Sequence, residues 1–78
     1  MKSLKIFLKE KRRQAGLTQL EFAERAGVAL TVIRKIEQGK ENLNLEKVNH
    51  VLSMFGHSLV PVANKDIEIN QSESNENS

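Results

Sequence analysis

Apolar residues recur at helical spacing near the start of the chain. Leu4, Leu8 and Ala15 share one stripe with the aliphatic stem of Arg12, and a glycine follows directly. A stripe of this period predicts an amphipathic helix, and glycine readily supplies the left-handed residue that ends one. We therefore expect a first helix over residues 3–15.

A second helix is predicted to begin at Thr18 and to end at Gly27. The Thr18 hydroxyl can accept a hydrogen bond from the backbone of Glu21, whose carboxylate can in turn accept one from the backbone of Thr18, and this exchange is a capping box. Leu17 and Phe22 stand where a hydrophobic staple would hold the incoming chain against the helix. The signals for the start of this helix therefore agree with one another.

A third helix is expected over residues 30–38, and Gly39 follows it. Val28, Ile33 and Ile36 supply apolar side chains for its inward face. The start of this helix differs from the start of the second, because the residue before it is an alanine, which has no side-chain oxygen to cap the helix.

A fourth helix is predicted between Asn44, a good N-cap residue, and Gly56. Its buried stripe is expected to consist of Leu45, Val48, Leu52 and Phe55. With this helix, all four glycines of the chain stand at predicted helix ends. The pattern predicts a mainly α domain over residues 1–57.

The pattern becomes extended over residues 58–63. Leu59, Val60 and Val62 are typical strand residues, and Pro61 restricts such a strand to the edge of a sheet. A single strand cannot satisfy its own backbone groups, and the same strand of a second subunit is the simplest partner. We therefore expect a homodimer through Leu59, Val60 and Val62, the alternative being an arm that lies across its own domain.

Charge divides the chain into a basic part and an acidic end. Residues 1–63 contain eleven Lys and Arg residues and six Glu residues, a net charge of +5, whereas residues 64–78 contain one Lys and four acidic residues, a net charge of −3. A basic domain attracts phosphate backbones. The polar acidic tail over residues 64–78 is expected to be disordered.

Composition argues against several classes of protein. The 78 residues allow one small domain, and the chain contains no cysteine, no signal-peptide pattern and no apolar run long enough to span a membrane. His50 and His57 have no accompanying nucleophile, paired carboxylates or metal-ligand spacing. We expect a cytoplasmic protein that is not an enzyme, with no catalytic residues, metal, cofactor or membrane partner.

The residues around the second and third helices resemble the helix-turn-helix domain of the phage Cro and repressor class, the XRE-type regulators. The matching positions are Gly16-Leu17-Thr18-Gln19, Phe22-Ala23, Ala26-Gly27-Val28, Ile33 and Ile36-Glu37-Gln38-Gly39-Lys40. The resemblance implies a four- to five-helix bundle like that of lambda repressor. It further implies that this chain binds a palindromic operator in double-stranded DNA. It also implies a structural ion pair between Arg12 and Glu37.

Within that class, the chain is most similar to the HipB-type antitoxins. The features that carry this narrower resemblance are Asn42-Leu43-Asn44-Leu45 and the strand-like residues 59–62, which stand where phage members have a fifth helix. The resemblance implies a repressor of its own operon that also binds a HipA-like kinase toxin. The alternatives are a solitary phage-type repressor and a toxin-neutralising interaction protein with secondary DNA binding.

The resemblance to the Cro and repressor class implies five base-reading positions at the start of the third helix and along it: Ala29, Leu30, Thr31, Arg34 and Lys35. Arg34 can bond both O6 and N7 of a guanine, and Lys35 can bond the same atoms less directionally. Thr31 can bond a base or a phosphate. Ala29 and Leu30 are expected to contact thymine methyl groups. Class members often have Ser or Thr where this chain has Ala29. Alanine cannot cap the third helix, but its small side chain would let the helix approach DNA closely.

Further positions are expected to hold the DNA without reading its sequence. Gln19 and Lys40 are predicted phosphate contacts. Thr18 is assigned to the same interface, although its capping role has the stronger support. Lys9, Lys11 and Arg13 are expected to add only long-range attraction. Leu20 stands where a polar residue is usual, so it is either an isolated surface leucine or a contact for a protein partner.

Overall fold

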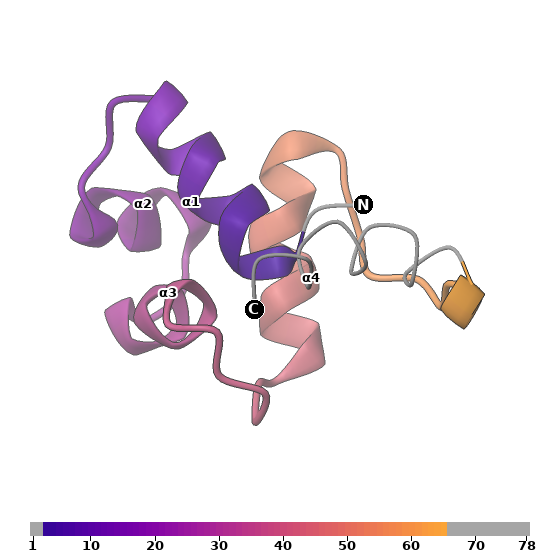
Figure 1. The fold of residues 1–78 in the computed structure, drawn as a ribbon. Coiled ribbons are helices and arrows are strands. Elements are labelled where there is room, and N and C mark those ends of the chain that lie inside the picture. The colour runs from indigo at the N-terminus through magenta and orange to yellow at the C-terminus, as the bar shows by residue number, and fades with distance from the viewer. Residues whose placement is uncertain (1–2, 66–78) are drawn as a thin grey trace.

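Four α-helices and one short 3-10 helix lie within the described part of the chain, whose last two residues, Asn64 and Lys65, are also helical. The computed structural model describes residues 3–65, in the order α1 (Leu4–Gln14), α2 (Gln19–Ala26), α3 (Leu30–Glu37), α4 (Leu45–Leu52) and η1 (Ser53–Phe55). In Figure 1, α1 crosses between α4 on the right and the pair α2 and α3 on the left. Of these helices, α3 packs against all three others. The predicted mainly α fold is confirmed, and no described helix combines the length and apolarity needed to cross a bilayer.

The helix ends follow the local signals in the sequence. The hydroxyl of Thr18 accepts from the backbone N–H of Glu21 at 3.1 Å, and the Glu21 carboxylate accepts from the backbone N–H of Thr18 at 2.8 Å, so the predicted capping box is present. The side chain of Asn44 caps α4 by accepting from the N–H of Lys47. Each predicted glycine terminus has a φ between 68° and 76°, the left-handed region that glycine adopts at little cost.

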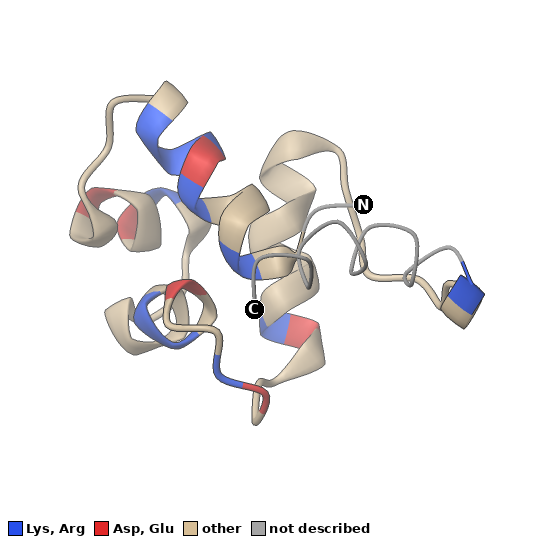
Figure 2. Cartoon of the chain, in the orientation of Figure 1, with Lys and Arg blue, Asp and Glu red and all other residues tan. Residues whose placement is uncertain are grey.

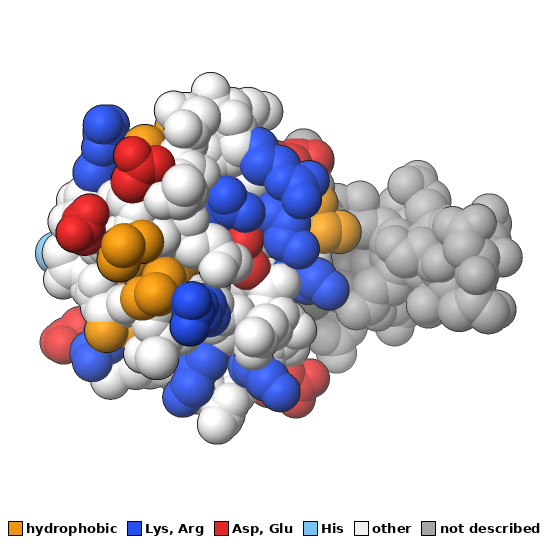
Figure 3. Space-filling model, turned by 90° about the vertical axis from the view of Figure 1, so that its left-hand side faces the viewer, with side chains coloured by type: hydrophobic (Ala, Val, Ile, Leu, Met, Phe, Trp, Pro, Cys, Tyr) orange, Lys and Arg blue, Asp and Glu red, His pale blue; other side chains and the backbone are white. Residues whose placement is uncertain are grey.

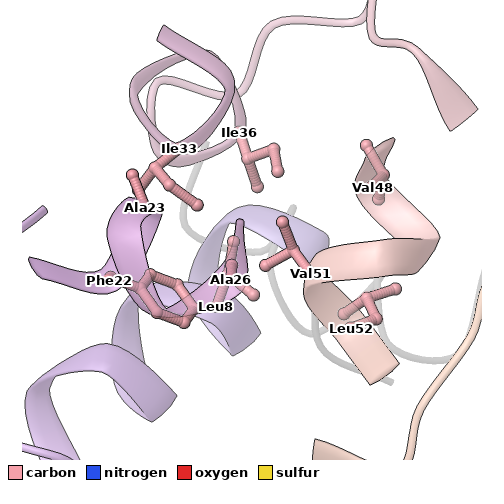
Figure 4. Packing of buried hydrophobic residues seen from close by; sticks show 9 residues of the cluster. All are labelled: Leu8, Phe22, Ala23, Ala26, Ile33, Ile36, Val48, Val51 and Leu52. Atoms are coloured by element: carbon pink, nitrogen blue, oxygen red, sulfur yellow. The ribbon is translucent and has the colours of Figure 1, made fainter. Parts of the chain in front are cut away.

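The hydrophobic core draws residues from all four α-helices (Figure 4). Its buried members are Leu8, Phe22, Ala23, Ala26, Ile33, Ile36, Val48, Val51 and Leu52. The ring of Phe22 is fully enclosed, and the ring of Phe55 packs against it with the two centroids 5.8 Å apart. Because α3 supplies Ile33 and Ile36 to this core, its opposite face is left for solvent or a partner.

Two predicted core positions are wrong. Ala15 is exposed at the C-cap of α1, and Leu45 is 66% exposed in the first turn of α4. Val51 takes the expected place of Leu45, because the stripe that faces α3 runs through Val48, Val51 and Leu52. Phe7 also packs against the core, with its ring centroid 6.4 Å from that of Phe55.

The expected strand over residues 58–63 is not confirmed. Within residues 3–65 the chain has no strand, and residues 57–63 have no regular secondary structure. Instead, the backbone N–H of Leu59 donates to the side-chain oxygen of Asn49 on α4 at 2.7 Å, which holds this segment against its own domain. The expectation for the tail falls on residues 64–78, most of which lie outside the described part of the chain.

Candidate nucleic-acid interface

A tight turn places α2 and α3 at an angle to each other. Gly27 adopts a left-handed conformation with φ 72°, and the N–H of Val28 donates back to the carbonyl of Ala23 at 3.1 Å. The chain can therefore leave α2 and start α3 within three residues. This arrangement of two helices is the helix-turn-helix geometry in which the second helix enters the major groove of DNA.

One face of α3 is buried and the other is exposed. Ile33, Ile36 and Glu37 are buried, whereas Thr31, Arg34 and Lys35 are exposed. The exposed residues have the i, i+3, i+4 spacing that puts side chains on one side of a helix. Of the five residues predicted to read bases, the structure thus brings Thr31, Arg34 and Lys35 together on an open face.

Ala29 and Leu30, the two apolar residues predicted to read bases, differ in their exposure at the start of α3. Ala29 is exposed, has extended backbone angles and makes no side-chain capping hydrogen bond, as expected for alanine. Leu30 is half-buried and packs against the hydrophobic core. Ala29 is therefore open to a partner, whereas part of the Leu30 side chain serves the fold.

A network of hydrogen bonds joins the ends of three helices. Arg12 donates from Nε to Oε2 of Glu37 at 2.7 Å, from a terminal nitrogen to Oε1 of Glu37 at 3.0 Å, and from its other terminal nitrogen to the carbonyl of Leu17 at 2.9 Å. The side-chain amide of Gln19 also donates to Oε1 of Glu37, at 3.1 Å. The ion pair between Arg12 and Glu37 that the resemblance implied is thus confirmed, and Gln19 adds a hydrogen bond to its carboxylate.

Two opposing effects act on the Glu37 carboxylate in this network. Burial raises the pKa of Glu37, while the hydrogen bonds from Arg12 and Gln19 and the charges of Arg12 and Lys9 lower it, so its pKa lies below the usual value. Hydrogen bonding between Arg12 and Glu37 also raises the pKa of Arg12. The pair is therefore charged at neutral pH, and α3 is held to α1 and α2 by charge-assisted hydrogen bonds.

The predicted phosphate contacts Gln19 and Lys40 both lie near the C-terminal end of α3. One N–H of the Gln19 amide is used by Glu37, and its second N–H is available to an anion. Thr18 caps α2 through its hydroxyl oxygen, which confirms that role. Lys40 is exposed, and its backbone N–H donates to the carbonyl of Lys35 at 3.0 Å, which closes the turn after α3.

Two residues that the sequence analysis did not select lie beside this face. Gln38 is exposed, and its position seven residues after Thr31 continues the same side of the helix. Lys47 of α4 lines a hollow of about 150 Å³ together with Thr31 and Lys35. The spacing of Gln38 was visible in the sequence, whereas the approach of Lys47 depends on how α4 packs against α3.

Among the helices of the described chain, α1 carries the most basic residues. Figure 2 shows several Lys and Arg positions along α1 and others on α3, on the loop that follows it and on α4. In Figure 3, basic side chains follow the right-hand part and lower edge of one face, and hydrophobic side chains lie left of its centre. Within residues 3–65, no three metal-ligating side chains come together. The arrangement offers cations, hydrogen-bond donors and a small apolar area.

Comparison with known proteins supports the same assignment. The sequence model of a helix-turn-helix family matches residues 8–58, which are 51 of the 78 residues. The matched segment contains α2, the turn, α3 and α4, together with most of α1. Neither the curated proteins nor the solved structures contain a significant match to the chain.

Proposed function

The chain belongs to the helix-turn-helix family and is a DNA-binding transcriptional regulator of the Cro and repressor class, and from this premise we propose that it is a dimeric repressor of a palindromic operator. The observation that carries the proposal is the exposed face of α3, where Thr31, Arg34 and Lys35 lie opposite the buried Ile33 and Ile36. No other described helix combines such a face with a tight helix-turn-helix junction at its N-terminal end.

Each residue on the face has a role in the proposed complex. Arg34 bonds a guanine through O6 and N7, which contributes about 1–3 kcal/mol of discrimination against other bases. Lys35 and Thr31 bond neighbouring bases or phosphates. Ala29, with the exposed part of Leu30, contacts thymine methyl groups.

The contacts around this face position α3 on the duplex. Gln19 donates to a phosphate through its second amide N–H, Lys40 through its ammonium group and Thr18 through its hydroxyl. Gln38 and Lys47 extend the contact area. These contacts carry no sequence information themselves, but they set the register of α3 in the groove.

We propose that residues 58–62 form the dimer contact. In an extended segment successive N–H groups point to opposite sides. Leu59 uses its N–H on Asn49, and Pro61, on the same side, has none. The N–H groups of Ser58, Val60 and Val62 would then point to the other side, where an antiparallel copy of the segment can accept them.

An apolar groove next to this segment supports the same dimer. The groove has a volume of about 550 Å³, and its walls come from α1, the end of α4 and the segment itself. Leu4, Phe7 and Leu52 contribute apolar surface, and Val60 at its rim is 67% exposed. A second copy related by a two-fold axis would cover both grooves at once. The recognition helices of the dimer would then occupy half-sites about 34–36 Å apart.

We further propose that the repressor is the antitoxin of a HipBA-like operon, which represses its own promoter and binds a kinase toxin. The strand-like residues 59–62 and the 53% exposure of Leu20, which gives a protein partner an apolar contact, support this role. The alternatives remain a solitary phage-type repressor and a toxin-neutralising protein with secondary DNA binding. The neighbouring reading frame separates them, because a kinase-like gene favours the antitoxin and a lysogeny locus favours the solitary repressor.

Hydroxyl-radical footprinting on the DNA upstream of the gene tests the operator proposal. We expect two protected patches on one face of the duplex, about one helical turn apart, with inverted-repeat sequences beneath them. Protection without a preferred site, or a single patch without a repeat, would refute a dimer on a palindrome.

A further inference from the structure

Lys5 of α1 lies against the turn at the C-terminal end of α3. A Cβ atom built on Gly39, the second residue after α3, would lie 3.3 Å from Cδ of Lys5. The aliphatic part of Lys5 therefore crosses this glycine, and its ammonium group, two bonds beyond Cδ, emerges beside the loop that carries Lys40. Lys5 and Lys40 are both exposed.

Lys9 lies near the same end of α3. Lys5, Lys9 and Arg12 stand at i, i+4 and i+7, so they share one face of α1. Two of the three have contacts that place this face against the end of α3, because Arg12 bonds Glu37 and Lys5 packs on Gly39. Lys9 lies between them on α1, and its charge acts on the Glu37 carboxylate.

The ammonium groups of this cluster are left available to an anion. Glu37, the nearest acid on α3, is already bonded by Arg12 and Gln19. Within residues 3–65, none of Lys5, Lys9 and Lys40 forms an ion pair with a carboxylate. The exposed face of α3 runs from Thr31 through Arg34 and Lys35 to Gln38 and so leads directly to this cluster.

We propose that Lys5 and Lys9, together with Lys40, form a phosphate-binding strip that holds the DNA backbone beside the C-terminal end of α3. The proposal rests on the proposed function, because it takes DNA in contact with the exposed face of α3 as given. It assigns to Lys9 a direct contact in place of long-range attraction. It also adds Lys5, which no pattern in the sequence had selected.

A second explanation for the three lysines has a different consequence. The C-terminal end of a helix carries a partial negative charge, and cations near it stabilise the folded protein by about 0.3–1 kcal/mol. If that were their whole role, replacing them would lower the stability and leave the number of phosphate contacts unchanged. The dependence of DNA affinity on salt separates the two roles, since each phosphate contact adds about −0.9 to the slope of log K against log salt concentration.

The test compares full-length Lys5→Gln, Lys9→Gln and Lys11→Gln on two duplexes, the DNA upstream of the gene and a random sequence. Lys11 is the matched control, because it lies on the same helix with its ammonium nitrogen 5.6 Å from the centroid of the Phe7 ring. Fluorescence anisotropy at several salt concentrations gives each slope, and urea unfolding gives each stability.

We expect Lys5→Gln and Lys9→Gln each to make the slope less negative by about 0.9 on both duplexes, and Lys11→Gln to leave it unchanged. If the wild-type protein binds DNA but the slopes of the Lys5 and Lys9 variants equal that of Lys11→Gln, the strip is refuted and the proposed function stands. A change in only one of the two lysine variants also refutes the strip. If the wild-type protein binds neither duplex, the proposed function itself has failed.

Discussion

Nε of Arg12 lies 2.7 Å from Oε2 of Glu37, and this ion pair fastens α1 to the C-terminal end of α3. The side chain of Glu37 is 2% exposed and that of Arg12 is 16% exposed, so the pair is largely shielded from water. Gln19 donates to the same carboxylate. The Glu37 carboxylate thus links α3 to both α1 and α2, in addition to the packing of Ile33 and Ile36 in the core.

Replacing that carboxylate by an amide is expected to destabilise the domain. Glu37→Gln leaves the Arg12 guanidinium without its charged partner, and loss of one member of a buried pair costs about 3 kcal/mol. The midpoint of urea unfolding measures the loss. Glu24→Gln is the control, because Glu24 is an exposed acid on α2 and its replacement should change stability by less than about 0.5 kcal/mol. Equal stability of the two variants would show that the pair contributes nothing.

The same carboxylate predicts a dependence of stability on pH. The pKa of Glu37 is lower in the folded protein than its usual value of 4.5, so the folded state favours the charged form. Its contribution is complete above that value and is lost as the pH falls through the lower pKa of the folded state. Urea midpoints of the wild-type protein and Glu37→Gln should therefore converge below about pH 4.5. A difference that stays constant down to pH 3 would contradict this assignment.

Adding the missing cap at the start of α3 should stabilise the fold and weaken DNA binding. Ala29→Ser supplies an oxygen that can accept from a free N–H of the first turn, worth about 1 kcal/mol. Ala15→Ser, at the exposed C-cap of α1, is the control and should give no such gain. A stabilised Ala29→Ser that binds the operator as tightly as the wild-type protein would show that close approach to DNA does not require alanine.

Lysine substitutions in the segment after η1 test the proposed dimer contact. Val60→Lys combined with Val62→Lys places two ammonium groups at the apolar groove, and we expect sedimentation velocity to change from a dimer to a monomer. Ala63→Lys, an exposed position one residue further along, is the control and should remain a dimer. A double variant that sediments as the wild-type dimer, or a wild-type protein that is monomeric, would refute the contact.

The helix boundaries could be predicted because short-range signals set them. The capping box of Thr18 and Glu21 and the left-handed glycines act within one turn of chain, and the structure has them where the sequence places them. Leu45 and Val51 were misassigned because burial depends on which side of α4 meets α3. The strand after Gly56 was expected from local β propensity, whereas the described segment bonds its own α4 through Asn49.

The candidate site divides in the same way. Thr31, Arg34 and Lys35 lie on one exposed face, which agrees with the helical periodicity of α3, although the resemblance to the Cro and repressor class had selected these residues. The hydrogen bond from Gln19 to Glu37 and the packing of Lys5 on Gly39 join residues 18 and 34 positions apart in the sequence. No spacing rule within one element can reveal such contacts, since they depend on the packing of three helices.

The most direct test of the account is the affinity of Arg34→Ala for the upstream DNA and for a random duplex, measured by anisotropy at one salt concentration. Arg25→Ala, the same charge change at an exposed position on α2, is the matched control. If α3 reads bases, Arg34→Ala should lose about 1–3 kcal/mol on the upstream DNA and much less on the random duplex, while Arg25→Ala changes neither greatly. An equal loss on both duplexes, or an Arg34→Ala that binds the upstream DNA as well as Arg25→Ala does, would contradict sequence reading by Arg34.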